Sequence, residues 1–383
     1  MTNTPLLTPL WKPVCRESCL PNLSSPAPDI HLGEAQQREQ DALAAHTQNP
    51  QDTWTTGPAG LLLEANKPDA TLAVIDTFGT APNQKVDHGE ITSALAMQAS
   101  GLGESNLLRV DDSFSPFKPV TAQNFGDGLD QFIESRYAGF THNTTAALKE
   151  IHENYPQINT ISQSQGLSGP KLTGDIARHA QNDPNYALQL GQELGHPGPL
   201  DWNKPAPQRL IAERVQDTLA ASPEVAGELT ALRQELADHP EVAYFNSAGN
   251  DGQTQDLLSQ AGFRFDPAWN GSPQSTSPLT QSVAAAMPIG PDAYPTTYSQ
   301  RTLNDIAFDG RARVTVDGQP LCESATARPA PLLPWCAPFQ GTSFAAPLAA
   351  GTYNADPQAY ERLRMQALPP VEGATVLGTG MLH

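Results

Sequence analysis

The chain has no long apolar segment and few basic residues. Its 383 residues include no stretch of about 20 apolar residues, the length that a membrane-spanning helix needs. Lysine and arginine together number 22, against 41 aspartates and glutamates, so the formal charge is −19. Such a charge repels phosphates and anionic lipid, and neither nucleic acid nor a membrane is expected as a partner. An acidic surface also suits an exported protein.

Cysteine is scarce as well, with only Cys15, Cys19, Cys322 and Cys336. No second pair matches the spacing of Cys15 and Cys19 in the way a zinc site requires. Two pairs that are local in sequence favour two disulfides over four free thiols. Disulfides need an oxidising compartment and point to an exported or periplasmic setting. Residues 1–20 nevertheless lack the basic start and apolar core of a signal peptide, so the sequence leaves localisation open.

Several motifs of other enzyme classes are absent. The chain has no His-Glu-x-x-His, which argues against a zinc peptidase, and no Gly-x-Ser-x-Gly elbow, which argues against an α/β-hydrolase. No glycine-rich phosphate loop is present, so nucleotide use is not expected. No metal ligand is assigned from the sequence.

The most informative segment that is present is GTSFAAP at residues 341–347. Gly341 has no Cβ and lets a substrate approach the backbone closely. Ala345 and Ala346 favour a helix that packs tightly beneath Ser343. The segment therefore suits a serine nucleophile at the start of a buried helix. An alanine-rich helix with an ordinary capping serine is the alternative.

Three further segments carry polar side chains in suitable places. Residues 72–77, LAVIDT, predict a buried parallel strand with Asp76 at its carboxyl end, where ligands of α/β sheets bind. His88 precedes apolar residues at helical spacing. Residues 245–252, FNSAGNDG, end in a tight turn that would present the amide of Asn250. Together with the serine, these are the parts of an acyl-transfer site.

The order Asp76, His88, Asn250, Ser343 resembles that of the subtilisin-like serine peptidases, whose triad runs Asp, His, Ser. The serine motif is highly specific for this family. Each of the other three motifs is weak evidence by itself, but the four in this order are strong evidence. The similarity runs from about Thr55 to the C-terminus. The resemblance implies a three-layer α/β sandwich with a central, mostly parallel sheet and helices on both faces.

Two weaker similarities support the same family. Ser164-Gln165-Gly166 resembles the family's Ser-x-Gly substrate-binding edge, with Gln165 in place of the usual leucine. Residues 378–382, GTGML, resemble the short segment that often closes such domains. The resemblance thus implies a substrate-binding role for Ser164, Gln165 and Gly166.

The activity that the resemblance implies is that of a serine endopeptidase acting on protein or peptide. Ser343 would attack the scissile carbonyl, and His88 would take its proton as general base. Asp76 would hold the imidazole tautomer, while the Asn250 side chain and the Ser343 backbone amide would bind the oxyanion. No cofactor is required. Many members bind structural calcium, but no Asp-x-Asp-x-Asp-Gly loop is present and no ligand is assigned.

Asp76 and His88 lie only twelve positions apart, closer than is usual in the family. The eleven residues between them can span about 35 Å, so contact is feasible. The short spacing nonetheless leaves a catalytically inactive binding module as an alternative. A transpeptidase or macrocyclase on the same scaffold is another alternative, suggested by a helical insertion at residues 167–222.

The insertion shows helical patterns at residues 171–182, 186–194 and 206–220. It would either overhang the substrate cleft or form a surface appendage. Residues 1–54 form a Pro/Gln-rich arm, with a helical patch near 35–45, that either packs on the surface or occupies the cleft as an inhibitory peptide. Residues 55–383 are then the peptidase domain.

Strands and helices alternate through that domain, which indicates a parallel sheet. Expected strands cover residues 107–110, 158–166, 242–245, 283–289 and, with a turn, 308–316; expected helices cover 144–153 and 229–236. Eight histidines stand in polar or proline-flanked surroundings and are expected to be solvent-exposed: His31, His46, His142, His152, His179, His196, His239 and His383.

Overall fold

The computed structural model describes residues 29–32, 54–56, 61–64, 67–78, 87–111, 128–289, 292–300, 304–316, 319–321, 338–367 and 381–382. All four cysteines, the helical patch expected at 35–45 and residues 378–380 lie outside these ranges, so the disulfides stay a prediction. In the described part of the chain, no helix is both long and apolar enough to cross a membrane.

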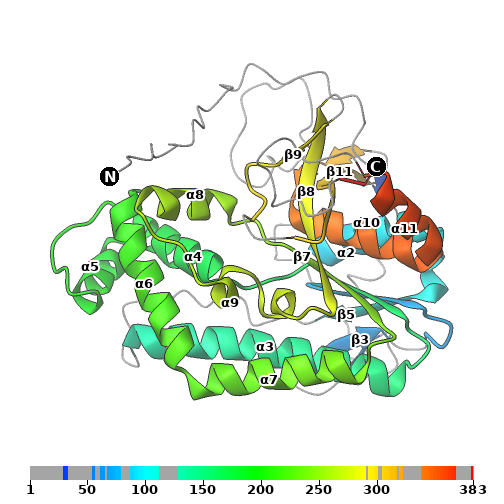
Figure 1. The fold of residues 1–383 in the computed structure, drawn as a ribbon, viewed down its shortest axis with the longest axis horizontal. Helices are drawn as coiled ribbons and strands as arrows, with labels where there is room; N and C mark the ends of the chain where they lie inside the picture. The colour runs from blue at the N-terminus through cyan, green and yellow to red at the C-terminus, as the bar shows by residue number, and fades with distance from the viewer. Residues whose placement is uncertain are drawn as a thin grey trace, which may run out of the picture.

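The core of the described part of the chain is a nine-stranded sheet (Figure 1). Six adjacent strands are parallel, in the order β10, β8, β7, β6, β4, β5; β3 and β2 continue the sheet antiparallel beyond β5, and β9 pairs antiparallel with β8. Their bounds are β2 (Trp54–Thr56), β3 (Leu62–Glu64), β4 (Leu72–Asp76), β5 (Leu107–Asp111), β6 (Thr160–Gln163), β7 (Ala243–Ser247), β8 (Thr280–Ile289), β9 (Asp292–Pro295) and β10 (Ile306–Asp309).

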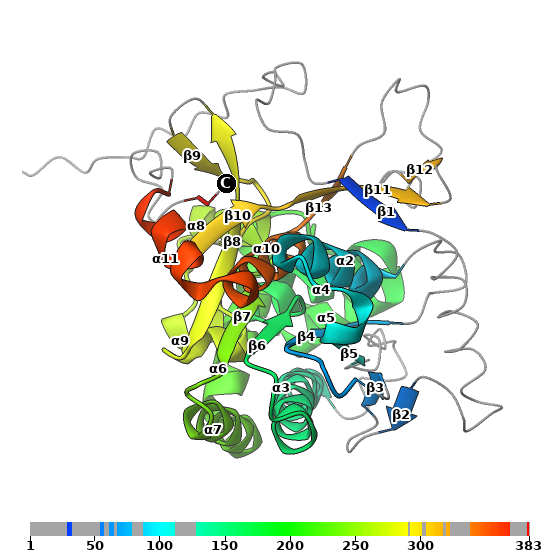
Figure 2. The same cartoon turned by 90° about the vertical axis from the view of Figure 1, so that its right-hand side faces the viewer.

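Helices cover both faces of this sheet (Figure 2). One face carries α2 (His88–Ser100), α10 (Thr342–Ala355) and α11 (Pro357–Met365); the other carries α3 (Gly128–Asn154) and α7 (Pro223–Asp238). The residues of β4 alternate between the two layers. Leu72 and Val74 pack with the α10 alanines, whereas Ala73 and Ile75 pack with α3 and α7. The three-layer α/β sandwich expected from the sequence is confirmed.

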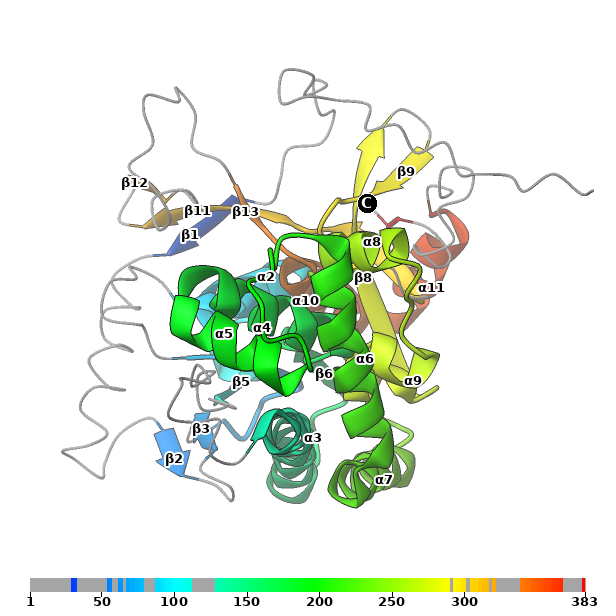
Figure 3. The ribbon, with the colours of Figure 1, turned by 90° about the vertical axis from the view of Figure 1, so that its left-hand side faces the viewer.

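The insertion forms a helical unit beside the sheet (Figure 3). Its helices are α4 (Gly169–Asn182), α5 (Pro184–Glu193) and α6 (Pro205–Ala221), which pack with α8 (Gly252–Gln260) and α9 (Pro267–Asn270). Each of α4, α5 and α6 has a proline in its first turn, where the missing N–H is not needed. The Ser168 hydroxyl accepts from the Lys171 amide and caps α4. The three helices expected in the insertion are therefore present.

Helix α3 is the largest departure from the sequence-based expectation. It begins at Gly128, whereas the expected helix began at residue 144. Ile133 and Tyr137 of its first half pack into the core of the insertion helices, not against the sheet. That packing partner is distant in sequence, which is why a local pattern did not reveal this half of the helix.

A second, smaller sheet adjoins the start of α10. In it β11 (Arg311–Val316) pairs parallel with β1 (Asp29–Leu32) and antiparallel with β12 (Gln319–Leu321) and β13 (Phe339–Gln340). Ala312 and Val314 of β11 pack on Phe344 of α10. The expected strand-and-turn at 308–316 is thus the end of β10 followed by β11. The chain also forms two short 3₁₀ helices within the described residues, η2 (Glu104–Asn106) and η4 (Pro273–Thr276).

Candidate active site

Asp76 ends β4 at the carboxyl edge of the parallel strands and is fully buried. Its carboxylate accepts hydrogen bonds from the Thr77 amide at 2.7 Å and from the Thr92 hydroxyl at 2.7 Å. Both donors fix the orientation of the carboxylate. Thr92 was missed from the sequence, although it lies on α2 one helical turn after His88, where its side chain shares that face.

His88 is the first residue of α2 and faces Asp76. Its Nδ1 lies 2.8 and 2.9 Å from the two carboxylate oxygens. The next residue, Gly89, donates its amide to the Thr77 carbonyl at 3.0 Å and ties the start of α2 to the end of β4. The twelve-residue spacing therefore does not prevent contact between the aspartate and the histidine.

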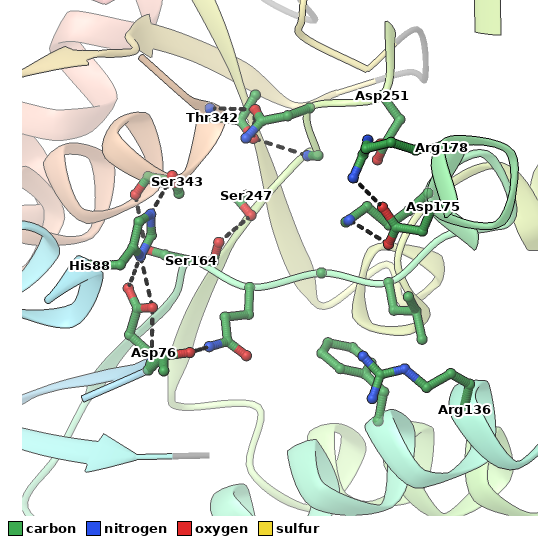
Figure 4. Close-up of a pocket in the computed structure, with 18 residues that line it drawn as sticks. Asp76, His88, Arg136, Ser164, Asp175, Arg178, Ser247, Asp251, Thr342 and Ser343 are labelled. Atoms are coloured by element: carbon green, nitrogen blue, oxygen red, sulfur yellow. Dashed lines mark hydrogen bonds and ion pairs between the residues drawn. The ribbon is translucent and has the colours of Figure 1, made fainter. Parts of the chain in front are cut away.

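Ser343 completes the relay (Figure 4). Its Oγ lies 2.8 Å from His88 Nε2, and the Ser343 residue is only 6% exposed. Because the ionised carboxylate of Asp76 can only accept, Nδ1 carries a proton, and in the neutral ring Nε2 is free to accept the Ser343 hydroxyl proton. The three side chains form a continuous path from hydroxyl to carboxylate.

The electrostatics of His88 reflect two opposing effects. Burial of the ring lowers its pKa, but the negative charge of Asp76 and the hydrogen bond to it outweigh that effect, so the pKa lies above the usual 6.5. The carboxylate therefore increases the basicity of the imidazole next to the serine.

Asn250 lies in the turn between β7 and α8. Its Oδ1 accepts from the Thr342 amide at 2.8 Å and from the Thr342 hydroxyl at 3.0 Å. Since a backbone N–H can only donate, the oxygen of the Asn250 side chain is identified, and its NH₂ group points the other way. The Thr342 hydroxyl in turn accepts the Gly249 amide at 3.0 Å. This linking role of Thr342 was also missed from the sequence.

Gly341 separates the Asn250 amide from the Ser343 hydroxyl. A Cβ at this position would lie 2.8 Å from Ser343 Oγ and 3.2 Å from Asn250 Nδ2. A side chain would therefore occupy the space between these two polar groups. Among the described residues, none accepts the backbone N–H of Ser343, which lies in the first turn of α10 where amides have no intrahelical partner. The Asn250 NH₂ group and the Ser343 hydroxyl thus lie on either side of one small space, and the Ser343 N–H has no acceptor among the described residues.

A cleft of about 520 Å³ opens from these residues. Its wall includes Ser164, Gln165 and Gly166, the residues for which a substrate-binding role was expected. Ser164 donates its hydroxyl to the Ser343 carbonyl at 2.9 Å, and Gln165 hydrogen-bonds to Thr77. No hydrogen bond from another described residue reaches the backbone amide or carbonyl of Gly166. Hydrogen bonds therefore fix this wall next to the triad, and the backbone amide and carbonyl of Gly166 are available to a ligand.

Charged residues of α4 line the far part of the same cleft. Asp175 is bridged by Lys171 at 2.6 Å and by Arg178 at 2.9 Å. Asp251 lies beside them (Figure 4). Burial raises the pKa of Asp251 to about 6; repulsion from Asp175 adds to this, while Lys171 and Arg178 oppose it. The charge of this part of the cleft therefore changes near pH 6.

No family model matches the chain, and no curated protein does. Among the solved structures that are similar to it are the following two. A Pseudomonas sedolisin (serine-carboxyl proteinase) complexed with two molecules of pseudo-iodotyrostatin is 12% identical, with a TM-score of 0.35, over 88% of this chain and 78% of that one. The PatG macrocyclase in complex with peptide is 13% identical, with a TM-score of 0.35, over 93% of this chain and 97% of that one. Similarity this low says nothing about the activity of the chain.

Proposed function

We propose that this chain is a subtilisin-like serine endopeptidase that hydrolyses peptide bonds through an acyl-enzyme. The observation that carries the proposal is the unbroken relay from Ser343 Oγ through His88 to the Asp76 carboxylate, at 2.8 Å on each side of the imidazole. A hydroxyl, an imidazole and a buried carboxylate in this arrangement are the parts that nucleophilic acyl transfer requires.

In the first half-reaction, Ser343 Oγ bonds to the substrate carbonyl carbon while His88 Nε2 takes the hydroxyl proton. The negative charge that develops on the carbonyl oxygen is stabilised by the Asn250 NH₂ group and the Ser343 amide, and the N-terminus of α10 adds a favourable dipole. The C–N bond then breaks, and His88 returns its proton to the leaving amine. Water repeats the steps in the second half-reaction and releases the acid and Ser343.

The substrate class is inferred from the cleft wall. The free backbone of Gly166 suits an extended peptide, because a strand that binds in this way pairs with exposed amide and carbonyl groups. A peptide chain would lie along Ser164, Gln165 and Gly166 and present its carbonyl to Ser343.

A fluorophosphonate probe tests the proposal directly. We expect the folded wild-type protein to be labelled and Ser343→Ala not to be labelled. Ser135→Ala is the matched control, because Ser135 is exposed on α3 and outside the cleft. A folded wild-type protein that takes up no label, before and after limited proteolysis of the N-terminal arm, would instead favour the inactive binding module.

The activity is expected to rise with pH as His88 loses its proton. Only the neutral imidazole accepts the serine proton, and the pKa of His88 lies above 6.5 because Asp76 outweighs the effect of burial. The acidic limb of kcat/KM, measured on a peptide substrate from pH 5 to 9, should therefore have its midpoint above 6.5. A midpoint below 6.5 would contradict the assigned role of the Asp76 contact.

Asn250→Ala is expected to lower kcat about 10²–10³-fold with little change in KM, the magnitude known for the same kind of residue in a subtilisin. Asn250→Asp separates the two roles of the side chain. It keeps an oxygen for the Thr342 amide but replaces the NH₂ group with a second acceptor, so it should be at least as inactive. Asn185→Ala, an exposed position on α5, serves as the control. If Asn250→Asp retains wild-type kcat, Asn250 is not an oxyanion donor.

A second candidate is amine transfer, in which an amine and not water resolves the acyl-enzyme. It is favoured by one observation, that Lys171, Asp175 and Arg178 of the insertion helix α4 line the cleft. Product masses distinguish the two: hydrolysis adds the mass of water, whereas transfer yields ligated or cyclic peptide.

The prediction that the arm inhibits the site stays a prediction. Its described strand, Asp29–Leu32, pairs with β11 and is not among the residues that line the cleft.

A further inference from the structure

A second cluster of polar side chains lies where α3 and α7 end, outside the cleft. The two helices run side by side along one face of the sheet (Figure 1). His152 lies near the end of α3, Glu235 on the last turns of α7, and His239 directly after α7. None of the three lines the active-site cleft.

The expectation that His152 is solvent-exposed was wrong, because its side chain is 5% exposed. Glu235 is 10% exposed and His239 33%. Glu235 Oε1 lies 2.7 Å from His152 Nδ1 and 3.7 Å from His239 Nε2. The two imidazole rings stack with centroids 3.8 Å apart. One carboxylate oxygen therefore faces a nitrogen of each ring.

We propose that His152, Glu235 and His239 bind one divalent transition-metal ion, of which Zn²⁺ is the best match. Two imidazole nitrogens and one carboxylate oxygen are a common zinc donor set. The three donor atoms already lie within 4.8 Å of one another. Tetrahedral zinc needs donor pairs about 3.3 Å apart, so small side-chain movements close the site. Water fills the remaining position.

The surroundings of His239 suit a metal ligand. His239 Nδ1 lies 3.3 Å from a carboxylate oxygen of Glu241. With the Nδ1 proton donated to Glu241, the Nε2 lone pair faces the Glu235 carboxylate. Two electron-rich atoms that face each other repel, and either a proton on Nε2 or a metal ion between them removes the repulsion; zinc titration distinguishes the two. A carboxylate that orients a metal-binding histidine through its other nitrogen is a recurring arrangement around metals.

The role of the ion would be structural. After α3 the chain enters β6, and after α7 it enters β7, which are neighbouring strands. An ion held by both helix ends would fix these two connections relative to each other. Since the three ligands lie outside the cleft, kcat for peptide hydrolysis should not depend on the metal.

Zinc titration of the EDTA-treated full chain tests the proposal. We expect one zinc per chain by calorimetry, and a Tm increase of about 3 °C at a free zinc concentration of about 100 times Kd. His239→Ala and Glu235→Gln should each lose both effects. The matched control is His142→Ala, because His142 pairs with Glu228 at 3.3 Å between the same two helices, and no third metal ligand lies beside them in the described part of the chain. It should bind zinc as the wild type does.

His88→Ala shows whether zinc binds at the active site instead. It should leave the stoichiometry at one, and binding that disappears in this variant would overturn the proposal. Absence of binding by the wild type, or unchanged affinity in His239→Ala, would overturn it as well. The far-UV circular dichroism and metal-free Tm of each variant confirm that it is folded before the comparison. The outcome does not depend on whether the chain is a peptidase.

Discussion

Ser343→Ala is expected to lower kcat for peptide hydrolysis by roughly 10⁶-fold, and adding His88→Ala should lower it little further. The magnitude is the one known for a subtilisin and is carried over by analogy. The physical reason is that Ser343 Oγ and His88 Nε2, 2.8 Å apart, act in one step, so that either is useless without the other. Two independent groups would instead give losses that multiply.

The comparison uses the two single variants and the double variant on one peptide substrate, with the residual rate set against the uncatalysed reaction. Ser343→Ala removes only one hydroxyl from a small residue, so its Tm should stay close to that of the wild type. If the single variant retains a tenth of the activity, or if the two losses multiply, Ser343 and His88 do not form one catalytic unit.

Asp76→Asn is expected to lower kcat about 10⁴-fold although the side chains have nearly the same shape. The Thr77 amide can only donate, so it selects the oxygen of the new side chain, at 2.7 Å in the present structure. The NH₂ group then takes the place of the second carboxylate oxygen, 2.9 Å from His88 Nδ1, while the retained oxygen still lies 2.8 Å from Nδ1. A donor now faces Nδ1 where only acceptors did, which increases the population of the tautomer with its proton on Nε2, and that tautomer cannot accept the serine proton.

The same substitution should shift the pH profile. Asp76 is what raises the pKa of His88 against the lowering effect of burial, so its neutralisation should move the acidic limb of kcat/KM to lower pH. Asp69→Asn, an exposed position just before β4, is the control. It should change neither kcat nor the pH of the acidic limb of kcat/KM. If kcat falls strongly while the acidic limb of kcat/KM stays at the same pH, Asp76 supports the fold and does not act by raising the pKa of His88.

Much of the fold could be predicted from local patterns. Leu72 to Ile75 form an apolar run that ends in a carboxylate, and such a run is buried on both faces of a parallel sheet. The first half of α3 was missed because Ile133 and Tyr137 gain their burial from insertion helices that lie far away in sequence. A local window contains no information about that partner.

The same limit applies to the candidate site. Asp76, His88, Asn250 and Ser343 were predicted from their order, and the structure brings them together. Thr92 and Thr342 were not predicted to take part, because a threonine in a helix is ordinary until its acceptor is known. The cluster of His152, Glu235 and His239 was missed for a related reason, since it forms only when the ends of two helices meet.

The pairing of β1 with β11 has a consequence for processing of the chain. Asp29–Leu32 supplies the backbone partner for residues 313–316 of β11. Cleavage that released this strand would leave amides and carbonyls of β11 without their ladder, and such a strand recruits the equivalent strand of another molecule. A shortened form would therefore self-associate in a concentration-dependent manner, whatever its catalytic state.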